Sequence, residues 1–143
     1  MIIRNIKTKD VETVVELWYQ TSIIADDFIP ESYWGKNKDA MASIYLPNSE
    51  TYVAIEDEKI VGFVSMAENI LAAIFVEKKI QGKGIGKKLL NFIKRRRNRI
   101  QLKAYKRNTK TVDFYTSQDF KIISENKEKE TGEYEYLMQW IKE

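Results

Sequence analysis

The sequence predicts an α+β fold, in which helices flank a mixed, mostly antiparallel β-sheet. Runs rich in β-branched and aromatic residues are spaced as in antiparallel hairpins, and helical patterns separate them. A glycine-rich turn joins an apolar run to a helical pattern in the middle of the chain. The chain has 143 residues, 43% of them apolar, which is enough to bury a core, and we expect residues 1–143 to form one domain.

The first third of the chain is predicted to hold one strand and two helices. Residues 1–6 are a short strand candidate, and Thr8 or Asp10 can cap a helix whose apolar positions recur with helical spacing. This helix should end before Pro30, because the residue before a proline is pushed out of the α region. A second helix is expected over residues 31–45.

Three strands are predicted next. Residues 51–55 and 59–66 are joined by a short polar turn, which is a hairpin pattern, and Gly62 marks a bulge or a close approach of two backbones. The third strand is expected over residues 69–76. The remaining elements are then a helix over 84–97, a strand over 100–105, a short helix over 108–117, and a closing antiparallel pair over 120–124 and 134–140, connected by the polar stretch 125–132.

Residues 81–86, Gln-Gly-Lys-Gly-Ile-Gly, follow an apolar run and open a helical pattern, which is typical of a phosphate cradle. Glycine permits positive φ angles and a close approach to a ligand. The first N–H groups of a helix lack internal partners and lie at the positive end of its dipole, so an anion can bind there without any side chain. The same pattern also fits an ordinary tight turn.

The net charge of +3 is mild, but basic residues are concentrated around the glycine turn. A local positive field of this kind attracts a nucleotide phosphate or a nucleic-acid backbone, although a run of charges can also be a solvated helix face. The basic residues of this stretch are Lys83, Lys87, Lys88, Lys94, Arg95, Arg96, Arg97, Arg99, Lys103, Lys106 and Arg107.

The chain contains no cysteine and no histidine, which excludes disulfides, thiolate nucleophiles, Cys/His zinc sites and a histidine base. We expect no metal cofactor. The amino terminus lacks the apolar stretch of a signal peptide, and no segment approaches the length of a membrane span. We therefore expect a cytoplasmic protein with no membrane partner.

Two segments resemble the GCN5-related N-acetyltransferase (GNAT) superfamily. Residues 76–90 match its pyrophosphate loop, Gln/Arg-x-x-Gly-x-Gly/Ala, and residues 108–120 resemble its Asn…Phe-Tyr…Gly-Phe segment. The order of elements is also that of the family, and the resemblance is closest to small bacterial N-acetyltransferases, including protein-lysine acetyltransferases. Two departures stand out: Asp119 replaces the usual glycine, and the common proline two residues after Val76 is missing.

The resemblance implies a three-layer fold with a splayed strand pair and acetyl-CoA as the acetyl donor. The acceptor would be a primary amine of a protein lysine, a peptide N-terminus or a small molecule, attacking directly in a ternary complex. Asn108 would contact the pantetheine arm, although an asparagine that opens a helix is also a plain N-cap. The implied cofactor-binding residues are Ile74, Phe75, Val76, Gln81, Gly82, Lys83, Gly84, Ile85, Gly86, Lys87 and Asn108.

The resemblance also assigns Tyr115 as the catalytic general acid. A phenol is protonated at neutral pH and can donate to the departing thiolate. A tyrosine beside Phe114 can equally be packed in the core. No carboxylate lies in residues 69–76, so the proton of the amine would pass to water or to Glu68, Asp26 or Asp27.

Substrate choice is expected to come from the amino-terminal half of the chain. Acidic and aromatic side chains there suit a cationic amine, although aromatics at helical spacing also pack in cores. The candidate substrate residues are Asp26, Asp27, Phe28 and Trp34, with Trp18 and Tyr33 completing an aromatic wall.

Two alternatives to the enzyme stay open at this point. One is a basic nucleic-acid-binding module that uses residues 94–107, although this stretch lacks an interleaved aromatic stacking surface. The other is a catalytically silent acetyl-CoA sensor. The protein can be a monomer or a homodimer.

Overall fold

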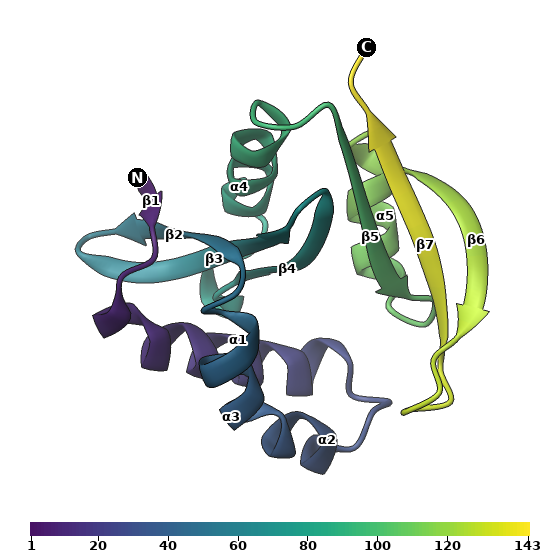
Figure 1. The fold of residues 1–143 in the computed structure, drawn as a ribbon, viewed down its shortest axis with the longest axis horizontal. Helices are drawn as coiled ribbons and strands as arrows, with labels where there is room; N and C mark the ends of the chain where they lie inside the picture. The colour runs from purple at the N-terminus through teal and green to yellow at the C-terminus, as the bar shows by residue number, and fades with distance from the viewer.

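The computed structural model describes residues 1–143 as one seven-stranded sheet in the order β1-β2-β3-β4-β5-β7-β6, with helices on both faces (Figure 1). All neighbouring strands are antiparallel except β4 and β5, which are parallel. The strands are β1 (Ile2–Asn5), β2 (Glu50–Glu56), β3 (Lys59–Ala67), β4 (Ile70–Val76), β5 (Arg99–Tyr105), β6 (Lys121–Lys127) and β7 (Tyr134–Ile141). The main helices are α1 (Val11–Ala25), α2 (Glu31–Lys36), α3 (Lys38–Ala40), α4 (Ile85–Lys94) and α5 (Thr109–Ser117). This confirms the predicted α+β fold.

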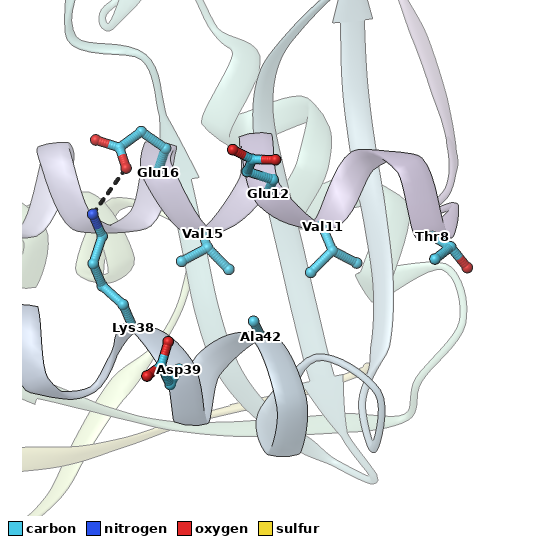
Figure 2. A pocket seen from close by; sticks show the side chains of 8 residues that line it. All are labelled: Thr8, Val11, Glu12, Val15, Glu16, Lys38, Asp39 and Ala42. Atoms are coloured by element: carbon cyan, nitrogen blue, oxygen red, sulfur yellow. Dashed lines mark hydrogen bonds and ion pairs between the residues drawn. The ribbon is translucent and has the colours of Figure 1, made fainter.

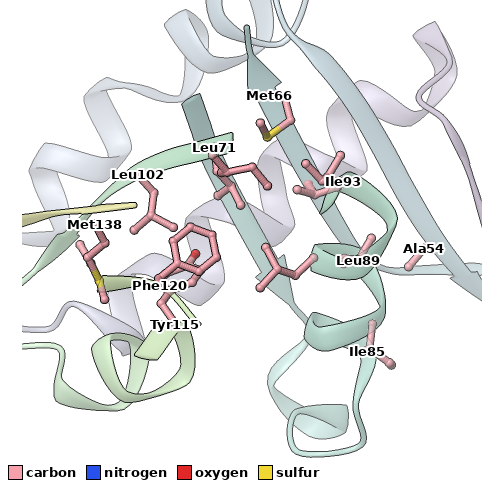
Figure 3. Close-up of a cluster of buried hydrophobic side chains, with 14 of the residues drawn as sticks. Ala54, Met66, Leu71, Ile85, Leu89, Ile93, Leu102, Tyr115, Phe120 and Met138 are labelled. Atoms are coloured by element: carbon pink, nitrogen blue, oxygen red, sulfur yellow. The ribbon is translucent and has the colours of Figure 1, made fainter. Parts of the chain in front are cut away.

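Two apolar clusters lie on opposite faces of the sheet and make the fold three-layered. Alternate residues of a strand point to opposite faces, so Val53 and Phe63 pack against α1, whereas Ala54 and Val64 pack on the side of α4. Figure 3 shows the second of these clusters, in which Leu89 and Ile93 of α4 meet Leu102, Tyr115 and Phe120. The helix α4 thus buries one apolar stripe and leaves Lys87 and Lys88 to solvent.

The amino end of α1 is fastened to the first strand by Asp10. Its carboxylate accepts a hydrogen bond from Lys7 N–H at 2.8 Å and pairs with the Arg4 guanidinium at 2.7 Å. These bonds supply partners for donors that a helix start otherwise leaves free. The guanidinium beside it holds the pKa of the Asp10 carboxyl below its usual value.

The strands β4 and β5 separate almost as soon as they meet. They share a single bridge, Ile70↔Gln101, whereas β5 and β7 stay paired along their whole length. The register of β4 against β3 also shifts between Leu71 and Ala73, which leaves Ala72 as a bulge. The edge of β4 that faces β5 is therefore unpaired beyond Ile70, which is the expected splayed pair (Figure 1).

Several boundaries differ from the sequence prediction. The basic helix ends at Lys94 rather than at residue 97, because the N–H groups of Arg96 and Arg97 donate to carbonyls only three residues back. The Arg96 side chain lies over the Phe92 ring and donates to the Phe92 carbonyl. The segment 31–45 is divided into α2, α3 and a π-helical turn, Met41–Tyr45. The strand β6 continues to Lys127, so the connection after it is shorter than expected.

Gly62 marks a close approach, as predicted. A Cβ atom built there would lie 2.9 Å from the Phe75 carbonyl oxygen of β4, closer than van der Waals contact allows. The bulge falls one residue earlier, at Val61. None of the helices is long and apolar enough to cross a membrane.

Candidate active site

The loop between β4 and α4 carries a run of free backbone donors. Gly82 and Gly84 have φ angles of 84° and 85°, and a Cβ atom at either would find nothing within 4 Å. The positive φ angles turn the chain into the first turn of α4. No backbone N–H group in the run from Gly82 through Lys87 donates a hydrogen bond within the protein.

Gln81 is one of the implied cofactor-binding residues, but its backbone N–H group is not free like those of the residues after it. Its N–H donates to the Lys78 carbonyl at 3.3 Å, and its side-chain amide donates to the Val76 carbonyl at 2.9 Å. Gln81 therefore anchors the loop to the end of β4. Gly86 packs closely against α5 and β4. A Cβ atom built at this glycine would lie 3.5 Å from the Phe114 ring and 3.8 Å from the Val76 side chain.

This loop fits an anionic group such as a diphosphate. Consecutive unpaired N–H groups at a helix start present aligned donors and the positive end of the helix dipole. Lys83 and Lys87 are exposed beside them and add positive charge. The open space over Gly82 and Gly84 lets a ligand reach the backbone itself.

Tyr115 lies on α5 with its ring in the core. The residue is 5% exposed, and its ring packs edgewise against Phe114, with centroids 5.4 Å apart. It also packs at a tilt against Phe120, with centroids 5.5 Å apart, and Figure 3 shows these two rings together. Its hydroxyl group has no protein hydrogen-bond partner, yet it is not among the fully buried unpaired atoms, which are Ser22 Oγ and Trp34 Nε1. Burial raises the pKa of Tyr115 above its ordinary value, so the hydroxyl stays protonated.

Asp119 explains how α5 ends without the usual glycine. It adopts a φ angle of 72°, a left-handed conformation that aspartate reaches more easily than most residues. The next N–H group, that of Phe120, then donates back to the Tyr115 carbonyl at 3.0 Å. This turn places Phe120 against the Tyr115 ring.

The side chain of Asn108 forms two hydrogen bonds within the protein. Its side-chain oxygen accepts from Thr111 N–H at 3.1 Å, which is an N-cap for α5. Its side-chain nitrogen donates to Asp26 Oδ1 at 3.0 Å, and this bond joins the end of α1 to the start of α5. The N-cap interpretation is thus confirmed, and Asn108 additionally faces the candidate substrate residues.

Asp26 is a buried carboxylate without a cation. It is 8% exposed and forms no ion pair. Burial raises the pKa of Asp26 to about 6, with the neighbouring charges of Asp27 and Glu128 adding to the effect and the Asn108 bond opposing it. Asp27 is exposed, and Phe28 packs edge-on against Tyr105 with ring centroids 5.7 Å apart.

The connection between β6 and β7 supplies acidic residues that sequence reasoning missed. Glu128 accepts from the Tyr105 hydroxyl at 2.7 Å, and Glu130 accepts from the Tyr33 hydroxyl at 2.9 Å. Burial and these carboxylates raise the pKa of both tyrosines. The only sequence signal was the glutamate content of this stretch, which does not show that it reaches the α1–α2 connection.

Two other candidate residues, Trp34 and Glu68, form none of the contacts described for Asp26 and Asn108. Trp34 is buried, with its ring edge-on to Trp18 and to Tyr33, so it is a packing residue of the interior. Glu68 lies in the turn between β3 and β4, where its carbonyl accepts from Arg97 Nε at 3.0 Å. That turn is at the end where β4 and β5 still meet, opposite the splayed end.

Three side chains of the basic stretch are engaged within the protein. Lys94 donates to the Gln118 carbonyl at 2.6 Å, Arg96 lies on Phe92, and Arg97 pairs with Glu50 at 3.0 Å. These side chains serve the packing of α4 against its neighbours. Three of the basic residues that the nucleic-acid-binding alternative would use are therefore bonded or packed within the protein.

A separate groove lies between the first half of α1 and the α3 region (Figure 2). Its volume is about 510 Å³, and an ion pair between Lys38 and Glu16 at 3.0 Å crosses one end of it. None of the candidate site residues lines it. The lining residues are Thr8, Val11, Glu12, Val15, Glu16, Lys38, Asp39 and Ala42.

A splayed strand pair beside a loop of free N–H groups fits a ligand with an extended arm and a diphosphate. The family described as Acetyltransferase (GNAT) domain matches residues 47–122. The chain belongs to this family, and it is an acetyl-CoA-dependent N-acetyltransferase. The amine it acetylates belongs to a protein or to a small molecule.

Relatives support the assignment over nearly the full chain. Peptidyl-lysine N-acetyltransferase YiaC of Escherichia coli is 32% identical over 97% of this chain and 96% of its own length. Peptidyl-lysine N-acetyltransferase YjaB of Escherichia coli is 24% identical over 91% of this chain and 88% of its own. The solution structure of apo YjaB covers 100% of both chains with a TM-score of 0.86 at 20% identity, which shows the shared fold.

Proposed function

We propose that this enzyme transfers the acetyl group of acetyl-CoA to the side-chain amine of lysine in a protein or peptide. The observation that carries the proposal is the similarity to peptidyl-lysine N-acetyltransferase YiaC, which extends over 97% of the chain. The buried carboxylate of Asp26, with Asp27 and Glu128 near it, supports a cationic acceptor. A cytoplasmic location and the choice between monomer and homodimer stay predictions.

The donor is proposed to bind along β4 and over the glycine loop. Acetyl-CoA supplies the activated acetyl thioester when it is bound. The unpaired edge of β4 at Ile74, Phe75 and Val76 can hydrogen-bond an extended chain as a neighbouring strand would. The free N–H groups of Gly82, Lys83, Gly84, Ile85, Gly86 and Lys87 would hold the diphosphate, with Gln81 anchoring the loop and Asn108 close to the pantetheine arm.

Tyr115 is proposed as the general acid. Its hydroxyl group is protonated and has no protein partner, so it is free to donate a proton to the leaving sulfur. The buried ring holds the hydroxyl in one place, because it packs between Phe114 and Phe120. With no cysteine in the chain, the amine is proposed to attack directly, without a thioester-linked acetyl-enzyme.

The acceptor amine is proposed to bind beside Asp26, Asp27 and Phe28. The two carboxylates attract a cation, and the Phe28 ring offers an apolar wall for a lysine stem. Trp34 contributes by supporting this segment from behind, since it is buried against Trp18.

The test uses purified enzyme, acetyl-CoA and three acceptors: an N-terminally blocked peptide with one lysine, the same peptide with arginine in its place, and a peptide with only its α-amine free. Mass spectrometry should show one acetyl group on the first and none on the second or third. Acetylation of the free α-amine alone, or only of a polyamine added as a fourth acceptor, would contradict the proposal.

A further inference from the structure

We propose that Asp26 binds the ammonium group of the acceptor lysine and removes its proton before the amine attacks. The inference rests on the proposed function, because it assumes a cationic acceptor. It assigns the proton acceptor of the reaction, for which the sequence leaves water, Glu68, Asp26 and Asp27 as equal candidates.

The position of Asp26 favours it over the other two carboxylates. Glu68 lies in the turn where β4 and β5 still meet, and Asp27 is exposed to solvent. Asp26 lies at the splayed end, where its bond to Asn108 joins α1, packed on β3 and β4, to α5, packed on β5. This bond therefore links the part of the molecule built on β1–β4 to the part built on β5–β7.

Tyr115 lies on α5, the helix that begins after Asn108. Asn108 caps α5, and Tyr115 follows seven positions later, which is two helical turns on the same face. The carboxylate that would take the proton is therefore bonded to the N-cap residue of the helix that carries the phenol that would give one.

Asp26 has no oppositely charged partner, and one buried hydroxyl group a helical turn away has no hydrogen bond. One of its oxygens accepts from Asn108 Nδ2, and none of its bonds comes from a lysine or arginine. Ser22, one turn earlier on α1, is fully buried, and its hydroxyl has no partner at all. A buried carboxylate without a counter-ion is costly, and a substrate ammonium group would remove that cost.

Groups from three segments surround Asp26, and two of them are charged. Asp27 follows it in the chain, Glu128 faces it from the β6–β7 connection, and Asn108 faces it from α5 without a charge. The guanidinium of Arg107 lies over the Phe28 ring at 5.4 Å. Because two carboxylates and burial disfavour the charged form, the pKa of Asp26 rises to about 6, which leaves it ionised at pH 7.5 but a stronger base than a solvated aspartate.

The proton balance of the step is complete. One proton of the ammonium group passes to Asp26, which becomes a neutral acid. The nitrogen lone pair then forms the N–C bond to the thioester carbonyl carbon, and the C–S bond breaks. Tyr115 protonates the leaving thiolate and recovers a proton from the nitrogen, while Asp26 releases its proton to solvent, so the net products are an amide, CoA thiol and one proton.

The experiment compares the pH dependence of kcat/KM in wild type, Asp26→Asn, Asp27→Asn and Asp113→Asn. Asparagine at position 26 can still accept the bond from Asn108, so the fold is preserved, and acetyl-CoA affinity by calorimetry should be unchanged. At pH 7 we expect Asp26→Asn to lose about a hundredfold in kcat/KM, and to recover most of it near pH 10, where free lysine is neutral. Asp27→Asn should keep the shape of the profile and shift its acid limb to lower pH, because the Asp27 charge contributes to the raised pKa of Asp26. Asp113→Asn, an exposed change on α5, should match wild type throughout.

A less basic acceptor separates proton removal from a structural role. In a peptide whose lysine is replaced by aminoethylcysteine, the amine is more often neutral, so the loss in Asp26→Asn should shrink severalfold. A loss that is equal at every pH and for both acceptors would overturn the proposal, and so would activity of Asp26→Asn above half that of wild type at pH 7. If wild type acetylates only a different amine, the lysine proposal fails, and the same variants are compared with that amine.

Discussion

At the scale of single residues, Tyr115 combines a packing role with a proposed chemical one. Tyr115→Phe keeps the ring between Phe114 and Phe120 and removes only the hydroxyl, which has no protein partner. We therefore expect kcat to fall about a hundredfold with little change in acetyl-CoA affinity or melting temperature. Steady-state kinetics and calorimetry measure this, and an unchanged kcat would reduce Tyr115 to a core residue.

Asp26 leads to a second prediction at this scale, on stability. Its pKa is raised in the folded protein, to about 6 from 3.8, so its ionisation destabilises the fold as pH rises through this interval, and the effect persists above it. Asp26→Asn should therefore raise the melting temperature at pH 8 and do so much less at pH 4. An equal change at both pH values would show that the carboxylate is not strained by burial. A group that opposes stability yet is buried is best explained by function.

At the scale of elements, the glycine loop can be tested against a matched glycine. Gly84 and Gly132 both have positive φ angles, of 85° and 75°, so a side chain at either strains the backbone by about 1 kcal/mol. Only Gly84 lies in the run of free N–H groups. Gly84→Glu should abolish acetyl-CoA binding in calorimetry, because a carboxylate would occupy the anion site, whereas Gly132→Glu should bind normally. Normal binding by Gly84→Glu would remove the assignment of the cradle.

At the scale of the whole molecule, we propose that residues 1–143 unfold as one domain. Strands β1–β4 and strands β5–β7 form two parts of the sheet, which meet at the Ile70↔Gln101 bridge. At that end of the strands the Arg97–Glu50 bond also joins the two parts. At the splayed end the Asp26–Asn108 and Tyr33–Glu130 bonds join them. Scanning calorimetry should show one transition of about 100 kcal/mol, with equal calorimetric and van't Hoff enthalpies. Acetyl-CoA should raise its midpoint without splitting it, and two separate transitions would contradict the proposal.

Local patterns predicted much of the fold. The apolar spacing in α1, the turn before β3 and the helix start at Asn108 depend on residues a few positions apart, which short-range hydrogen bonding and side-chain alternation govern. The end of α4 was placed too late, because the change to three-residue turns after Lys94 is not visible in helical periodicity.

By itself, the sequence determined the order of elements, the glycine loop and the Asn108–Tyr115 segment, and with them the family, because each is a contiguous pattern with a local physical cause. Only the tertiary structure decided that Gln81 anchors the loop and that Asp26 meets Asn108 across 82 residues of chain. The reason is that desolvation and charge proximity depend on which distant segments pack together. The pKa of Asp26 is therefore a property of the fold and not of its neighbours in sequence.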